Sequence, residues 1–124
     1  MSLENIQLTI SLSDRQLEEE KLQTETQNIL SEIEQFDGVQ NVNLAPVETA
    51  EPGAKNIGGF LIGILTAEIN AENLKSLVGY LGDRLSGKTI KIKAESKSRK
   101  INIEVRNVED LKKALAEVDD FLKA

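Results

Sequence analysis

The sequence predicts an α/β fold of the α+β type, a two-layer sandwich in which helices pack on a four-stranded mixed sheet. Polar and apolar residues alternate near the start of the chain and in two later runs, as in half-buried strands. Elsewhere apolar residues recur every three or four positions, as on one face of a helix. The chain has 124 residues, about the length of one domain. We therefore expect a single domain over residues 1–124, with residues 1–5 flexible.

The start of the chain predicts a strand followed by a helix. Residues 6–12 alternate strictly between apolar and polar side chains, which indicates a strand with one buried face. Ser13 or Asp14 is typical of a helix N-cap. Residues 14–36 then carry an apolar stripe, and Gly38 provides the glycine that commonly follows a helix.

A short second strand and a loop come next. Residues 39–44 predict the strand. Pro46, Pro52 and Gly53 interrupt any periodicity, so residues 46–56 are expected to form a loop.

The segment from Ile57 to Ser86 predicts a helix that is broken near its middle. Residues 70–73, Asn-Ala-Glu-Asn, resemble a new N-cap, and apolar residues follow it at three- and four-residue steps. The first piece, residues 58–69, could instead be a buried strand, because periodicity does not separate the two for a short apolar run.

The last third predicts an antiparallel hairpin and a helix. Two alternating runs, residues 90–94 and 101–105, flank the polar residues 96–98. Asn107 then resembles the N-cap of a final helix with an apolar stripe at Val108, Leu111, Leu115, Val118 and Leu122. The expected order is strand, helix, strand, broken helix, strand, strand, helix, which makes three helical regions.

The composition excludes several kinds of chemistry. The chain has no histidine, cysteine or tryptophan, which removes Ser/His/Asp and Cys/His nucleophile arrangements and zinc sites built on thiolate or imidazole. Acidic runs such as residues 18–20 fan out around a helix, so they do not converge on a metal ion. We expect no catalytic residue, no metal and no cofactor.

The charges are divided unevenly along the chain. Residues 1–52 hold two basic and eleven acidic side chains, whereas residues 84–106 hold eight basic and two acidic ones. Lysines on a strand can simply be a solvated face that discourages strand addition. The functional alternative is a docking patch for an acidic protein partner, with candidate contact residues Lys91, Lys93, Lys97, Arg99 and Lys100. Glu104 and Arg106 can occupy the corresponding face of the second hairpin strand.

Two further features bear on partners and location. Residues 51–59 lead into a predicted helix and could hold an anion, but their glycines match no phosphate-binding motif, so a flexible connection is the simpler interpretation. No apolar run approaches the roughly 20 residues of a membrane span, and the first residues lack the features of a secretory signal. We therefore expect a cytoplasmic protein with no membrane contact. The sequence leaves its oligomeric state open.

The layout over residues 6–120 resembles the bacterial effector-associated constant component family. The resemblance is carried by the strand 6–12, the loop 51–55, the glycine-containing apolar segment 58–65, the helix 74–84, the strand 88–94 and the helix 107–122. At Tyr80 the chain departs from the tryptophan that members often carry. The resemblance implies a non-enzymatic adaptor that accompanies an effector module, often a caspase-like or trypsin-like peptidase, in bacterial conflict systems.

The function expected from the sequence is thus a protein-interaction or adaptor domain that binds a protein effector. Two alternatives stay open. One is a small enzyme that uses carboxylate or lysine chemistry. The other is a nucleic-acid binder acting through the basic hairpin 88–106, which the acidic overall charge and the lack of aromatic residues on those strands disfavour.

Overall fold

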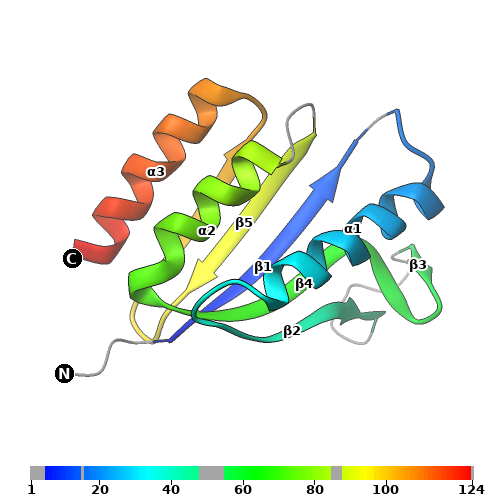
Figure 1. The fold of residues 1–124 in the computed structure, drawn as a ribbon, viewed down its shortest axis with the longest axis horizontal. Coiled ribbons are helices and arrows are strands. Elements are labelled where there is room, and N and C mark those ends of the chain that lie inside the picture. The colour runs from blue at the N-terminus through cyan, green and yellow to red at the C-terminus, as the bar shows by residue number, and fades with distance from the viewer. Residues whose placement is uncertain (1–4, 15, 48–54, 85–87, 124) are drawn as a thin grey trace.

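The computed structural model describes residues 5–14, 16–47, 55–84 and 88–123. The described residues form six strands and three helices (Figure 1). Their bounds are β1 Asn5–Ser13, α1 Glu19–Glu34, β2 Val39–Pro46, β3 Asn56–Ile57, β4 Phe60–Asn70, α2 Ala71–Arg84, β5 Thr89–Glu95, β6 Lys100–Val105 and α3 Val108–Lys123.

The strands form one sheet in the order β2-β4-β1-β5-β6, with the short β3 paired to β4. Each of these pairings is antiparallel. The predicted α+β class is confirmed, but the expected four-stranded mixed sheet was wrong in strand number and direction. The error in strand number arises at β3 and β4, where the end of a loop and a helix were predicted. The error in direction arises at β4, which returns antiparallel between β2 and β1.

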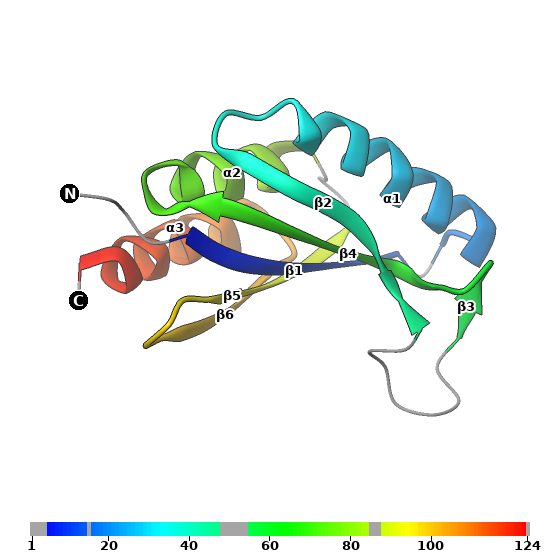
Figure 2. The same ribbon diagram turned by 90° about the horizontal axis from the view of Figure 1, so that it is seen from below.

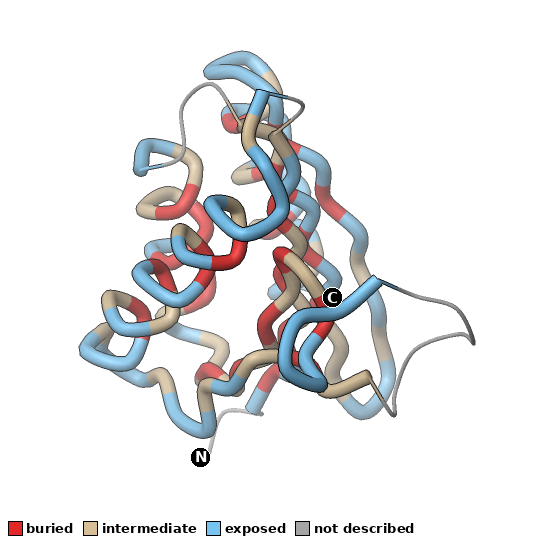
Figure 3. The backbone as a smooth tube through the Cα atoms, turned by 90° about the vertical axis from the view of Figure 1, so that its right-hand side faces the viewer, coloured by how far each residue is buried: buried red, intermediate tan, exposed pale blue. Residues whose placement is uncertain are grey.

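The three helices lie on one side of the sheet (Figure 2). The core between the layers is aliphatic, and its fully buried members include Ile10, Ile33, Leu65, Leu77 and Ile90. Figure 3 shows the buried residues gathered where helices and strands face each other. This arrangement leaves the other face of the sheet without a helical layer.

Segment 58–69 is a strand, not the first piece of a broken helix. Gly58 and Gly59 have φ of 60° and 87°, the left-handed backbone that a two-residue hairpin turn requires. They join β3 to β4, so that Ile57 lies opposite Phe60. Side chains of β4 then alternate between buried and half-buried, and the half-buried positions Ile62 and Ile64 are apolar as well. That composition explains why periodicity left the two interpretations open.

The first helix begins at Glu19, five residues later than predicted. The Asp14 carboxylate accepts a hydrogen bond from the Gln16 N–H at 2.9 Å, which forms a turn instead of a helix start. Of the stripe predicted through Leu17, Leu22, Ile29, Ile33 and Phe36, only Ile29 and Ile33 are fully buried. The helix also buries two polar residues, Gln23 and Thr26.

The predicted starts of the other two helices are confirmed. The side chain of Asn70 accepts a hydrogen bond from the Asn73 N–H at 3.2 Å, and that of Asn107 accepts one from the Asp110 N–H at 2.8 Å. The predicted stripe of α3 holds only in its middle, because Val108 is 68% exposed at its start.

The side chain of Gln23 forms hydrogen bonds with β4 of the kind that a neighbouring strand would otherwise form. Its side-chain amide donates to the Leu61 carbonyl at 3.2 Å and accepts from the Gly63 N–H at 2.8 Å. Gly63 has φ of 77°, and an added Cβ would lie 2.6 Å from the Leu12 carbonyl oxygen. The chain therefore bends at Gly63 beside β1, and Gln23 satisfies the two backbone groups that the bend leaves in the core.

A polar cluster ties α1 to α2 at the surface. The Glu32 carboxylate accepts hydrogen bonds from Arg84 at 3.0 and 3.1 Å and from the Tyr80 hydroxyl. The Arg84 guanidinium, followed by the Tyr80 hydroxyl, lowers the pKa of Glu32 below 4.5. The Tyr80 ring also packs against Phe36, with 5.7 Å between ring centroids.

Parts of three sequence predictions lie outside the described residues. These are the flexible start, of which residues 1–4 are not described, the loop 46–56, of which residues 48–54 are not described, and the end of the second helix at residues 85–87.

Candidate functional site

The helices of the described residues all lie on one face of the sheet, and we call the other face the open face (Figure 2). In β1, Leu8 and Ile10 are buried against the helices, whereas Thr9 and Ser11 are half-buried on the other side. The registers of β1 with β5 and of β5 with β6 extend this alternation across the sheet. On these three strands the open face includes Gln7, Thr9, Ser11, Ser13, Thr89, Lys91, Lys93, Glu95, Lys100, Asn102 and Glu104.

Three of the five predicted contact residues share the open face. Lys91 lies between Ser11 and Glu104, and Lys93 lies between Thr9 and Asn102. Lys100 is opposite Glu95 at the start of β6. The alternating hairpin pattern in the sequence therefore correctly predicted that Lys91 and Lys93 share a face, and their role as contact residues stays a prediction.

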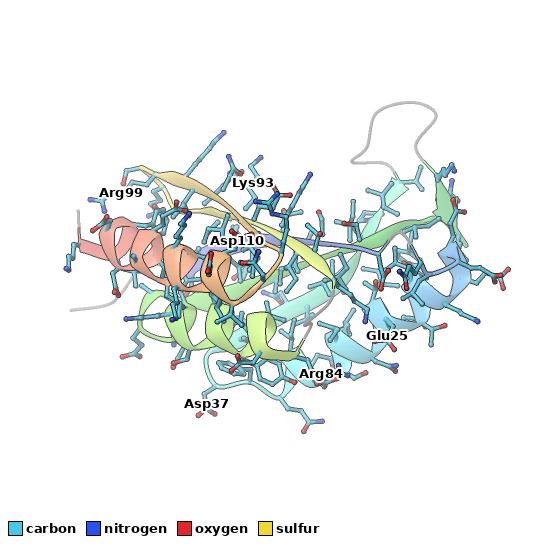
Figure 4. The ribbon with its side chains drawn as sticks, turned by 90° about the horizontal axis from the view of Figure 1, so that it is seen from above. Glu25, Asp37, Arg84, Lys93, Arg99 and Asp110 are labelled. Carbon is cyan, nitrogen blue, oxygen red and sulfur yellow. The ribbon has the colours of Figure 1, made fainter. Side chains whose placement is uncertain are left out.

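The other two predicted residues lie at the end of the hairpin. Lys97 is exposed in the turn between β5 and β6. Arg99 donates a hydrogen bond to the Phe121 carbonyl at 2.7 Å, at the end of α3. Figure 4 shows Lys93 on the side of the sheet away from the helices and Arg99 beside the end of α3. Arg99 therefore fastens the hairpin to α3 through a helix carbonyl, a favourable position for a cation.

Some cations of the open face are already neutralised by neighbours. The Lys93 ammonium lies 2.9 Å from the Glu95 carboxylate and lowers the pKa of Glu95. Arg106, just after β6, lies 3.0 Å from Asp110 and lowers the pKa of that carboxyl group.

The remaining cations of the hairpin form no close ion pair with a described carboxylate, although Lys100, opposite Glu95, also helps to lower the pKa of Glu95. Within residues 5–14, 16–47, 55–84 and 88–123, no carboxylate lies within 4.0 Å of Lys91, Lys97 or Lys100. The open face is thus a mixed-charge face on which Lys91 and Lys100 form no close ion pair, and not the uniform basic patch that residue counts indicate. Lys97, in the turn, also has no close ion pair with a described carboxylate.

Two adjoining hollows indent the open face. One, of about 590 Å³, lies by Ser13, Thr89 and Arg106, and the other, of about 410 Å³, lies over Thr9, Ser11 and Asn102. Lys91 and Glu104 line both hollows. Lys91 and Glu104, with hydroxyl and amide groups around them, therefore form a mixed-charge polar surface that can pair with both acidic and basic groups of a partner.

Sequence reasoning missed the contribution of β1 to this surface. Thr9 and Ser11 are about 80 residues from Lys91 and Lys93 along the chain but directly opposite them in the sheet. Alternation in β1 shows that these hydroxyls share one face, but no local pattern shows that β1 and β5 are neighbours.

The described part of the chain contains no group of three or more acidic side chains placed to hold a metal ion. No described helix is long and apolar enough to cross a membrane. Comparison with known proteins gives no match to a family model, to a curated protein or to a solved structure.

Proposed function

We propose that this protein is a non-enzymatic interaction domain, an adaptor that binds a protein effector through the open face of its sheet. The effector is of the peptidase type, caspase-like or trypsin-like, as in the bacterial conflict systems to which the resemblance of the sequence layout points.

The observation that carries the proposal is the position of the unpaired lysines. Lys91 and Lys100 lie on a sheet face that no helix covers, and Lys97 extends from the same hairpin. An unpaired surface ammonium attracts acidic groups of a partner and raises the association rate. The Thr9 and Ser11 hydroxyls beside Lys91 add hydrogen-bonding groups, which fits the polar composition of many non-obligate interfaces.

The experiment is a binding assay with the protein products of the genes next to this one. The Lys91→Glu/Lys100→Glu variant should bind about tenfold or more weakly, because two favourable charges become repulsive. The matched control is Lys112→Glu/Lys113→Glu, which changes the net charge equally at exposed positions of α3. It should bind like the unchanged protein.

Two results would contradict the proposal. One is a folded protein that binds none of the neighbouring products, and the other is an equal loss of affinity in both double variants. Strongly salt-dependent binding to DNA or RNA that disappears in Lys91→Glu/Lys100→Glu would assign the surface to nucleic acid instead.

A further inference from the structure

The two edges of the sheet are built differently. Along β2 the pairing with β4 shifts twice, between Gln40 and Asn43 and between Leu44 and Pro46. Asn41 in that strand has φ of 54°. Such bulges and a proline make an edge a poor template for another strand. β6 at the opposite edge pairs with β5 without any register shift.

Backbone groups of β6 point to the free edge at every second residue. The Ser96 N–H donates to the Arg99 carbonyl at 2.9 Å, so the hairpin closes on a hydrogen-bonded pair. Because hydrogen-bonded and non-hydrogen-bonded pairs alternate in antiparallel strands, Ile101 and Ile103 bond to β5. The N–H and C=O groups of Lys100, Asn102 and Glu104 face outward.

The residue after β6 supports this alternation. Arg106 has the same parity as the outward residues, and its N–H donates to the Asp110 carboxylate at 3.1 Å. By this alternation the backbone groups of Lys100, Asn102 and Glu104 do not bond to β5, and no backbone hydrogen bond of a turn or cap in the described residues involves them. The free edge of β6 therefore offers three N–H and three C=O groups in the spacing of a strand.

The side chains along the free edge of β6 determine which charges an added strand should carry. Lys100 and Glu104 are exposed on the open face at the two ends of the edge, with Asn102 between them. Lysines on an edge strand discourage pairing with a further strand, because their ammonium groups resist burial. An edge with opposite charges at its ends instead favours a strand with an acidic residue opposite Lys100 and a basic residue opposite Glu104.

The edge of β6 could pair with a second copy of this protein or with a single extended segment, and the position of α3 distinguishes the two. α3 packs against β6 on the helical side of the sheet. Paired strands lie about 4.8 Å apart, whereas packed helices need about 8–10 Å between their axes. A second copy paired through β6 would bring its own α3 too close to the first, but a lone extended segment brings no helix.

We propose that the free edge of β6 binds an extended segment of the partner protein as an added antiparallel strand. The segment carries an acidic residue opposite Lys100, a polar residue opposite Asn102 and a basic residue opposite Glu104, with β-branched residues between them. This recognition mode, in which backbone hydrogen bonds give affinity and side chains give specificity, rests on the proposed adaptor function.

The test uses two synthetic peptides with blocked ends and the same composition. The matching peptide is Thr-Val-Lys-Val-Thr-Val-Glu, and the control, Thr-Val-Glu-Val-Thr-Val-Lys, exchanges the two charges. In a titration of the labelled protein followed by nuclear magnetic resonance, the matching peptide should shift the amides of Lys100, Asn102 and Glu104 and bind at least fivefold more tightly. N-methylation of the peptide at its Lys, central Thr and Glu should abolish the shifts.

Asn102→Pro tests the same edge from the protein side. Proline removes an outward N–H and no bond to β5, so the fold should persist and the peptide should no longer bind. Asn102→Thr, which keeps the N–H, should bind like the unchanged protein. Equal binding of both peptides, or shifts at β2 instead of β6, would overturn the proposal. If Asn102→Pro fails to fold, the N-methylated peptide tests the same backbone hydrogen bonds, and unchanged shifts with it would overturn the proposal.

Binding assays with the effector distinguish strand addition at β6 from the broader proposal of an adaptor function. If the effector binds Asn102→Pro normally but not Lys91→Glu/Lys100→Glu, the adaptor function stands and strand addition is wrong. If the matching peptide binds but no effector does, the edge accepts a strand and the proposed effector partner is wrong.

Discussion

Replacing Gln23 with leucine should cost the protein a substantial part of its stability. The Gln23 side chain is 5% exposed and is hydrogen-bonded to both the Gly63 N–H and the Leu61 carbonyl. Leucine leaves both backbone groups buried without partners, at about 1–3 kcal/mol each. The apolar surface that leucine buries offsets part of this, so we expect a loss of about 2–4 kcal/mol from a total that is typically about 5–15 kcal/mol.

Urea denaturation followed by circular dichroism measures this loss directly. The control is Gln27→Leu, an exposed position on the same helix, which should change the free energy of unfolding by less than about 0.5 kcal/mol. A loss below about 1 kcal/mol for Gln23→Leu, with an unchanged denaturant slope, would refute the view that Gln23 replaces a strand partner.

Glutamate at the same position adds a test by pH. A carboxylate can accept from the Gly63 N–H but cannot donate to the Leu61 carbonyl, and burial raises the pKa of such a group. The Gln23→Glu variant should therefore be closest to the unchanged protein at acidic pH and lose stability as pH rises toward 7. A deficit that does not depend on pH would contradict this reasoning.

Three further predictions concern backbone geometry, a helix cap and an ion pair. Gly63→Ala should lower the free energy of unfolding by about 2–4 kcal/mol, because the new Cβ meets the Leu12 carbonyl oxygen at a positive φ, and a loss under about 1 kcal/mol would contradict that geometry. Asn107→Ala should cost about 1 kcal/mol in the same assay through loss of the cap on α3, whereas no change would show that the cap is unimportant. Glu32→Gln should reduce stability most near pH 7, because Arg84 lowers the pKa of Glu32 in the folded state. Its deficit should shrink as pH falls below 4.5, and a deficit that grows in acid would have the wrong sign.

Local patterns in the sequence predicted the elements whose two faces differ. Ile6–Leu12 alternates because one side meets the helices and the other meets solvent, and the hairpin 90–105 does so for the same reason. Asn70 and Asn107 indicated helix starts because the side chain of an N-cap bonds to a backbone N–H only three residues further along the chain. For such elements the physical cause lies within a few positions of the residue concerned.

Features that depend on distant contacts could not be predicted. The first half of β4 carries apolar residues on both faces, Leu61 and Leu65 on one and Ile62 and Ile64 on the other, so its pattern does not distinguish a strand from a helix. Gln23 is polar and yet buried because β4 bends at Gly63, 40 residues away. The candidate site was predicted where its lysines alternate along the hairpin, and missed where β1 contributes Thr9 and Ser11 from across the sheet.

The most direct test of the account is a map of the backbone amide resonances of the labelled protein with and without its effector. We expect the largest changes along β5 and β6, with Lys91, Lys100 and Asn102 among them, and little change in α1 and α2. Changes concentrated on the helical layer, with β5 and β6 unaffected, would contradict the claim that the open face and its β6 edge bind the partner.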